Sequence, residues 1–278
     1  MLSTGRCTEG KTIRLCPRRM KILYWLRNDL RVHDNEVLAA LPAHAGVLLL
    51  VYCFDPATHG PDRYLGLPRL GPHRLPFLLD TLADLQRRYA ALGSGIQFIV
   101  GNPATELPQL VRALGLSDVW MSAEHLHEET TAETDLAAAL GRGVSLRLFE
   151  TLSLLHPHDL PIPVQQLPLS FSKFRFDVVV GTPVRPPLPG PRQLPPLPAG
   201  LVPAPLPVAA DLATTLGLPA ANGQPRDACS ALPPLGGGET AALVRLHDYV
   251  VDRRLLRAIT TPATRCWARP LAPSFRPG

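Results

Sequence analysis

The sequence lacks the cysteine patterns and long apolar runs that would mark a metal-binding, disulfide-bonded or membrane protein. Its five cysteines form no CxxC pair and no zinc-type spacing. We therefore expect reduced thiols in an intracellular protein. No apolar run approaches the ~20 residues of a membrane span. The longest, GVLLLVYCF at 46–54, has the length of a buried strand, so no membrane contact is predicted.

The usual ligand and catalytic motifs are absent as well. There is no GxGxxG or GxxxxGK[ST] phosphate loop, no GxSxG elbow and no HExxH helix. Among the nine histidines, His125 and His127 are the closest pair that could face one pocket, but they lack a third ligand at a suitable spacing. We therefore predict no metal site and assign no catalytic residue.

The charge balance is basic but not concentrated. The formal net charge is +5 and the pI is about 9.2, yet no dense basic stripe occurs. This permits contact with nucleic acid without indicating it. Residues 1–20 are basic with one acid, Glu9. They are typical of an organelle transit peptide for chloroplast or mitochondrion, or of a disordered leader in a protein of the cytoplasm or nucleus.

Short apolar runs alternate with helical patterns over residues 21–150. The helical patterns carry apolar residues at helical spacing, and several end in glycine. Near-continuous apolar strands separated by helices indicate βαβ units, so we predict an α/β fold with a doubly wound, Rossmann-like, five-stranded parallel sheet. The predicted strands are 21–26, 46–54, 96–101, 118–123 and 145–150, and the main helices are 35–43, 73–93, 104–115 and 130–141.

The composition changes sharply near residue 183. Of the chain's 32 prolines, 15 lie between Pro183 and Gly236, and this stretch has no helical or strand periodicity. This indicates an extended, semi-rigid or disordered linker. A helical pattern returns at 236–256, followed by a tail without cap signals. The predicted organisation is therefore a leader at 1–20, an α/β domain at 21–182, a linker at 183–235 and a short helical remnant at 236–278.

In such a fold, ligands bind beyond the carboxyl ends of the strands, where the strand order reverses. The charged stretch after the first strand, which includes Arg27, Asp29, Arg31 and Asp34, lies on that edge. We expect these charges to pair with one another, with the region 171–175 or with a second domain. Asp34 or the following asparagine is also a good cap for the next helix.

Several motifs together resemble the cryptochrome/photolyase family, and DASH-type cryptochromes in particular. The first is WLRNDLRVHDNEVLAAL, and it is followed in order by VYCFDPATHG, VGNPATELPQLV and LHPHDLP. The helix at 73–93 opens with Gly71-Pro72-His73-Arg74, where DASH proteins typically have Gly-Ala-His-Arg. The phrase ending in Phe-Arg occurs at 171–175, and GGGETAALVRLHDYV resembles the start of the family's helical flavin domain. The resemblance covers about residues 21–180 and 236–250.

This resemblance implies the fold and function of a light-dependent protein. The α/β domain of such proteins carries an antenna chromophore, commonly methenyltetrahydrofolate, and the helical domain carries FAD. The antenna passes absorbed energy to the flavin. The reduced flavin then donates an electron to a cyclobutane pyrimidine dimer, especially in single-stranded DNA.

The resemblance also assigns an antenna contact to an acidic residue after the fourth strand. Within HLHEETTAE at 125–133, Glu129 aligns best and Glu128 is its rival. A methenyl-folate is cationic at its bridge, so a partly buried carboxylate would stabilise it. The alternative is that these acids simply occupy the first turn of a helix, where the helix dipole favours them. Lys173 and Arg175 could meet a phosphate or carboxylate, or could be solvated.

The chain departs from the family after Val251. The family would continue into a long helical domain with the flavin pocket and the DNA cavity, whereas Gly278 follows 27 residues later. The expectation is an antenna domain that is inactive alone as a carbon–carbon lyase, because its FAD site is missing. A truncated gene model, a frame change or a short isoform would each explain this. The alternative function is a non-catalytic α/β ligand-binding or interaction module.

Overall fold

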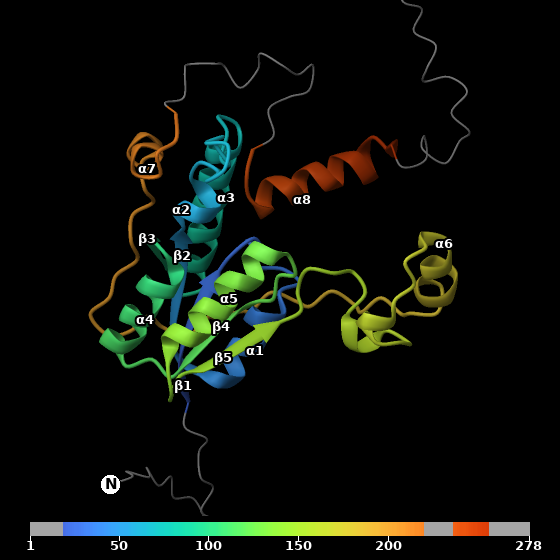
Figure 1. Cartoon of the computed structure of the whole chain (residues 1–278), viewed down its shortest axis with the longest axis horizontal. Helices are drawn as coiled ribbons and strands as arrows, with labels where there is room; N and C mark the ends of the chain where they lie inside the picture. The colour runs from blue at the N-terminus through green and yellow to red at the C-terminus, as the bar shows by residue number, and fades with distance from the viewer. Residues whose placement is uncertain (1–18, 220–235, 256–278) are drawn as a thin grey trace, which may run out of the picture. The chain divides into compact units, whose positions relative to one another are not determined.

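The computed structural model describes residues 19–219 and 236–255, and the chain divides into two compact units, Met1–Glu239 and Thr240–Gly278. The first unit is an α/β fold with a central sheet (Figure 1). The predicted leader, the middle of the glycine- and proline-rich stretch at 220–235 and the tail beyond 255 lie outside the described residues.

The sheet has five parallel strands in the order β3-β2-β1-β4-β5. The strand order reverses between β1 and β4. The chain adds β2 and β3 on one side of β1 and then β4 and β5 on the other side. The prediction of a doubly wound parallel sheet is confirmed, with every strand within one residue of its expected bounds. The strands are β1 Met20–Leu26, β2 Ala45–Phe54, β3 Ile96–Val100, β4 Asp118–Ser122 and β5 Ser145–Phe149.

Local capping accounts for some of the helix ends, whereas the helix predicted at 130–141 begins at His127 without a side-chain cap. Asn35 caps the first helix by accepting the backbone N–H of Leu38 at 3.0 Å, so Asn35, and not Asp34, is the cap. Asn102 caps α4 in the same way, and α4 ends at Gly115, whose φ of 58° is left-handed. The helices between strands are α1 Glu36–His44, α2 Pro56–His59, α3 Arg74–Ala91, α4 Pro103–Leu114 and α5 His127–Leu140.

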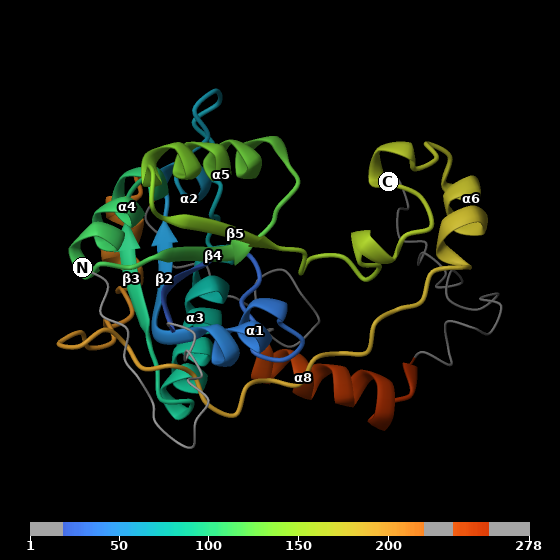
Figure 2. The same ribbon diagram turned by 90° about the horizontal axis from the view of Figure 1, so that it is seen from below.

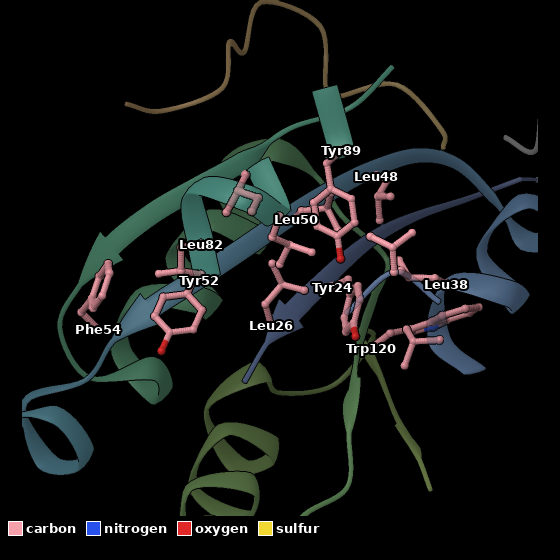
Figure 3. Close-up of a cluster of buried hydrophobic side chains, with 14 of the residues drawn as sticks. Tyr24, Leu26, Leu38, Leu48, Leu50, Tyr52, Phe54, Leu82, Tyr89 and Trp120 are labelled. Atoms are coloured by element: carbon pink, nitrogen blue, oxygen red, sulfur yellow. The ribbon is translucent and has the colours of Figure 1, made fainter. Parts of the chain in front are cut away.

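Helices cover both faces of the sheet, so β1, β2 and β4 are buried on both sides, whereas the edge strand β5 is largely exposed (Figure 2). Side chains alternate along β1: Tyr24 faces α1 and α3, while Trp25 faces α4 and α5. In the larger cluster, Tyr24 and Tyr89 pack with the leucines of β2, and Trp120 lies close to Leu38 (Figure 3). Burial on both faces explains why the strands are near-continuous apolar runs.

The proline-rich segment is extended, as its composition predicts, and from residue 183 to 219 it lies along the first unit. Its backbone exchanges hydrogen bonds with the sheet and its flanks: Leu194 N donates to Leu92 O, Leu48 N to Pro196 O and Ala204 N to Ile96 O, all at 2.9–3.0 Å. Leu194 is 2% exposed. We call residues 183–208 the strap. It leads into α7, Ala209–Thr215, whose Leu212 is also buried.

Short helical turns occupy the segment between β5 and the strap: η1 Pro157–Asp159, η2 Val164–Gln166, α6 Phe171–Phe174 and η3 Arg175–Val179. The helix α8, Glu239–His247, begins at the last residue of the first unit and continues as η4, Asp248–Asp252. The predicted helical pattern at 236–256 is thus a helix over most of its length. Across residues 19–219 and 236–255, no helix is long and apolar enough to span a membrane. The domain boundaries proposed from the sequence remain predictions.

The buried side chain of Leu194 provides a test of the strap. We expect Leu194→Ala to lower the free energy of unfolding by about 2–4 kcal/mol, because it opens a cavity in the main core. The matched control is Val202→Ala in the same strap, since Val202 is 76% exposed and should change stability by less than about 0.5 kcal/mol. Urea unfolding followed by circular dichroism measures both. Equal, small effects would show that the strap does not pack on the core in solution.

The partly buried His59 predicts a pH dependence of stability. Burial lowers the pKa of His59, whose ring bonds to Tyr52 Oη at 3.0 Å and to the Asp55 carbonyl at 3.1 Å. The folded state therefore favours neutral His59. Its stabilising effect is complete above the unfolded pKa, about 6.5, and is lost as the pH falls below it. From pH 7.5 to 5.0, the wild type should lose more stability than His59→Gln, by at most about 1.4 kcal/mol per pH unit.

Urea unfolding at the two pH values measures this difference, and the control is the exposed His127→Gln, which should follow the wild type. An identical pH slope in His59→Gln and the wild type would contradict the burial of a neutral ring.

Candidate functional site

Arg27 lies at the point where the strand order reverses, directly after β1, and its side chain is only 6% exposed. Its guanidinium pairs with Glu124 at 2.9 Å and with Glu133 at 2.5 Å. It also donates to the backbone carbonyl of Glu129 at 3.3 Å and lies 4.9 Å from the ring centroid of Trp25. One buried cation thus joins the ends of β1 and β4 to the first turns of α5.

We call Arg27, Glu124 and Glu133 the switch-point triad. Glu124 follows β4 closely and is 5% exposed, and Glu133 is 12% exposed. Asn28 donates its side-chain amide to Glu124 Oε1 at 2.8 Å, and Glu133 Oε1 accepts the backbone N–H of Glu124 at 3.1 Å. Buried carboxylates require such partners. With two carboxylates and one guanidinium, the triad carries one net negative charge.

The two candidate antenna contacts lie in the first turn of α5 and have different surroundings. Glu128 forms a two-point ion pair with Arg69, at 2.6 and 2.8 Å, and Arg69 also pairs with Asp62 at 3.1 Å. The hydrogen bond from Arg69 lowers the pKa of Glu128. Oε2 of Glu129, by contrast, is buried and has no hydrogen-bond partner among the described residues. Of these two glutamates, only Glu129 therefore offers a buried carboxylate oxygen without a hydrogen-bond partner.

The other predicted charges after β1 pair mainly with one another. Arg31 lies 2.9 Å from Asp29 and 3.5 Å from Asp34, and it donates to the backbone carbonyl of Thr151 at 3.1 Å. Burial raises the pKa of the Asp29 carboxyl, and the Arg31 guanidinium opposes that effect. Asp34, at φ 55°, accepts the backbone N–H of Leu188 in the strap at 3.0 Å. This loop is held by the chain's own groups.

Lys173 and Arg175 are both exposed on α6 and η3. In the part of the chain that the structure describes, neither forms an ion pair, although the Arg175 guanidinium lies 5.9 Å from the ring centroid of Phe176. The structure does not bring them together with the charges after β1. Within residues 19–219 and 236–255, no cluster of three His, Cys, Asp or Glu side chains could hold a metal ion.

Sequence reasoning missed Glu124, Glu133 and Asn28, and it named other partners for Arg27. A signal was present, because Glu124 follows β4 much as Arg27 follows β1. Using that signal requires knowing that β1 and β4 are neighbours, which is a property of the topology. The position of Glu133 one helical turn beyond Glu129 is the second clue, since residues four apart share a helix face.

The comparison with known proteins agrees with this architecture. Residues 22–191 match the family described as DNA photolyase. The chain therefore belongs to the DNA photolyase family, and its first unit is the family's N-terminal α/β domain. Members of the family are flavin-dependent, chromophore-binding proteins that act on DNA.

Within that family, the chain is similar to DASH cryptochromes. It is 41% identical to Cryptochrome DASH of Gloeobacter violaceus over 85% of this chain and 46% of that protein. It is 36% identical to Cryptochrome DASH of Xenopus laevis over 87% of this chain and 45% of that protein. The solved cryptochrome of Synechocystis superposes with a TM-score of 0.72 at 31% identity, over 85% of this chain and 47% of that one.

The chain thus spans about half the length of these relatives. Two plant relatives, from Solanum lycopersicum and Arabidopsis thaliana, are named Cryptochrome DASH, chloroplastic/mitochondrial. The predicted family and fold are confirmed. No finding supports the alternative, a non-catalytic α/β ligand-binding or interaction module.

The switch-point triad leads to a test of the buried cation. We expect Arg27→Met to lower the free energy of unfolding by about 3–5 kcal/mol, because it leaves two carboxylates buried without their counter-ion. Adding Glu133→Gln should restore part of the loss, since one of the unpaired charges is then removed. Chemical unfolding of the single and double variants measures both effects. The control is the exposed Arg175→Met, and an equally small loss for Arg27→Met would contradict the buried triad.

Proposed function

We propose that the first unit is an antenna domain that binds a cationic pterin, such as methenyltetrahydrofolate, at Glu129. The observation that carries the proposal is the buried and unpartnered Oε2 of Glu129. Buried carboxylate oxygens without a partner are rare in folded proteins, because desolvation disfavours them. A cation or hydrogen-bond donor from a ligand would supply the missing partner. Glu128 is a weaker candidate because Arg69 already occupies both of its oxygens.

The surrounding charge supports the same ligand class. The switch-point triad carries one net negative charge and contacts the Glu129 backbone through Arg27. A ligand with a delocalised positive charge is stabilised by this charge, whereas an anionic group at the same place would be repelled. The residues present therefore fit the cationic bridge of a methenyl-folate. When bound, the pterin would supply absorption of near-ultraviolet light.

We propose for this unit the antenna role alone. FAD, and single-stranded DNA carrying a cyclobutane pyrimidine dimer, are the cofactor and substrate expected for the complete family. Because the chain spans about half of its relatives, lyase activity would require a flavin-binding domain in addition to this unit. We assign no catalytic residue within the described chain.

We propose an intracellular location, with chloroplast or mitochondrion as the specific candidates. The basic residues 1–20 and the names of the two plant relatives support an organelle. Expression of the chain fused at its carboxyl end to a fluorescent protein would decide between an organelle and the cytoplasm or nucleus.

Substitution of the two neighbouring glutamates separates the proposed contact from its rival. We expect Glu129→Gln to weaken the binding of 5,10-methenyltetrahydrofolate at least about tenfold, because it removes a charge from the partner of the cation. Glu128→Gln should change the dissociation constant by less than about threefold, since its charge is already matched by Arg69. Titration of the purified full chain, followed by the pterin's absorption band, measures both.

Circular dichroism of each variant must first show an intact fold. Saturable binding by the wild type with equal loss in both variants would contradict the role of Glu129. No saturable binding by the wild type would contradict the antenna proposal itself.

A further inference from the structure

The Gly-Gly-Gly-Glu segment at 236–239 makes a contact that the antenna role does not use. The carboxylate of Glu239 accepts two successive backbone N–H groups from the loop after β1, Val32 at 2.7 Å and His33 at 2.9 Å. It also forms an ion pair with Arg88 of α3, and the Glu239 side chain is only 10% exposed. Segments more than 200 residues apart in the sequence meet at this one side chain.

Glycine is required on the approach to this contact. A Cβ at Gly237 would collide with the backbone oxygen of Phe77 in α3. At Gly238 the backbone has a φ of 101°, and a Cβ would lie 2.6 Å from the Cβ of Asp84. Side chains rarely adopt that φ, and both positions run against the surface of α3. The glycines therefore let the chain lie close enough to α3 for Glu239 to reach the loop.

The groups around the Glu239 carboxylate are of the kind that bind carboxylates: two backbone N–H groups and the guanidinium of Arg88. Two adjacent N–H donors and a guanidinium are the donors that bind carboxylates most strongly, because each hydrogen bond to a charged acceptor is strengthened. The two N–H groups each meet a different oxygen of Glu239. Val32 is buried, so its N–H would be costly to leave without a partner in the folded chain.

We propose that Val32 N, His33 N and Arg88 form a carboxylate-binding site whose ligand is this chain's own Glu239. Through this contact, Glu239 is a positioning residue that holds the loop carrying Asp29, Arg31 and Asp34. The same contact anchors Glu239, the last residue of the first unit. The contact of Glu239 does not involve Glu129.

Amide hydrogen exchange on the full chain tests the site. In Glu239→Ala, exchange at Val32 and His33 should become at least about tenfold faster, while the amides of β2 keep their protection. Added acetate should slow exchange again at those two positions, because a free carboxylate can enter the vacated site. In Glu239→Ala combined with Arg88→Met, the same acetate concentration should have a smaller effect. The control is Asp135→Asn, an exposed acid on α5, which should leave both amides unchanged.

Unchanged exchange at Val32 and His33 in a folded Glu239→Ala protein would overturn the proposal, as would a failure of acetate to slow exchange there. If Glu239→Ala does not fold, two milder variants test the carboxylate-binding site in its place. Glu239→Gln keeps the size of the side chain, and Gly238→Ala keeps the carboxylate but obstructs its approach. Both should speed exchange at the same two amides, and no change in either would contradict the site.

Discussion

The ion pairs of the buried Arg27 guanidinium hold together the carboxyl edge of the sheet. This guanidinium stands where the strand order reverses, and it is the counter-ion of both Glu124 and Glu133. Without it, the carboxylates of Glu124 and Glu133 would lie buried without a counter-ion, which is strongly unfavourable. The triad therefore joins β1, β4 and α5 at the edge of the sheet where such folds usually place a ligand. Glu129, the ligand contact that we propose, lies one helical turn from Glu133 on α5.

The strands, and with them the fold class, could be predicted from the sequence to within one residue. Parallel strands covered on both faces must be apolar on both sides, so their pattern is local and continuous. The ends of the helices also carry local signals, such as Asn35, Asn102 and Gly115. The family was predictable because several motifs occur in a specific order, and the match over residues 22–191 confirms it. Glu128 and Glu129 were identified by the same resemblance, and their role as ligand contacts remains a proposal.

The partners of these residues could not be predicted, because they are set by tertiary neighbours. Glu124 is the partner of Arg27 only because β4 lies beside β1, and Glu128 is occupied only because Arg69 reaches α5 from a distant loop. Proline content predicts an extended backbone, but no local pattern says which surface the strap follows or that Leu194 is buried. The contact of Glu239 with Val32 and His33 spans most of the chain and has no periodic signal either.

These contacts together explain how the chain's own groups hold a charged loop after an apolar strand. The triad, the Arg31 pairs and the Glu239 carboxylate hold the loop from within the chain, and Oε2 of Glu129 on α5 has no hydrogen-bond partner among the described residues. The most direct test is a crystal structure of the full chain with 5,10-methenyltetrahydrofolate. The account predicts pterin density with a ring atom within hydrogen-bonding or ion-pair distance of the Glu129 carboxylate, and an intact triad. Density at another surface, with Glu129 unchanged, would contradict it.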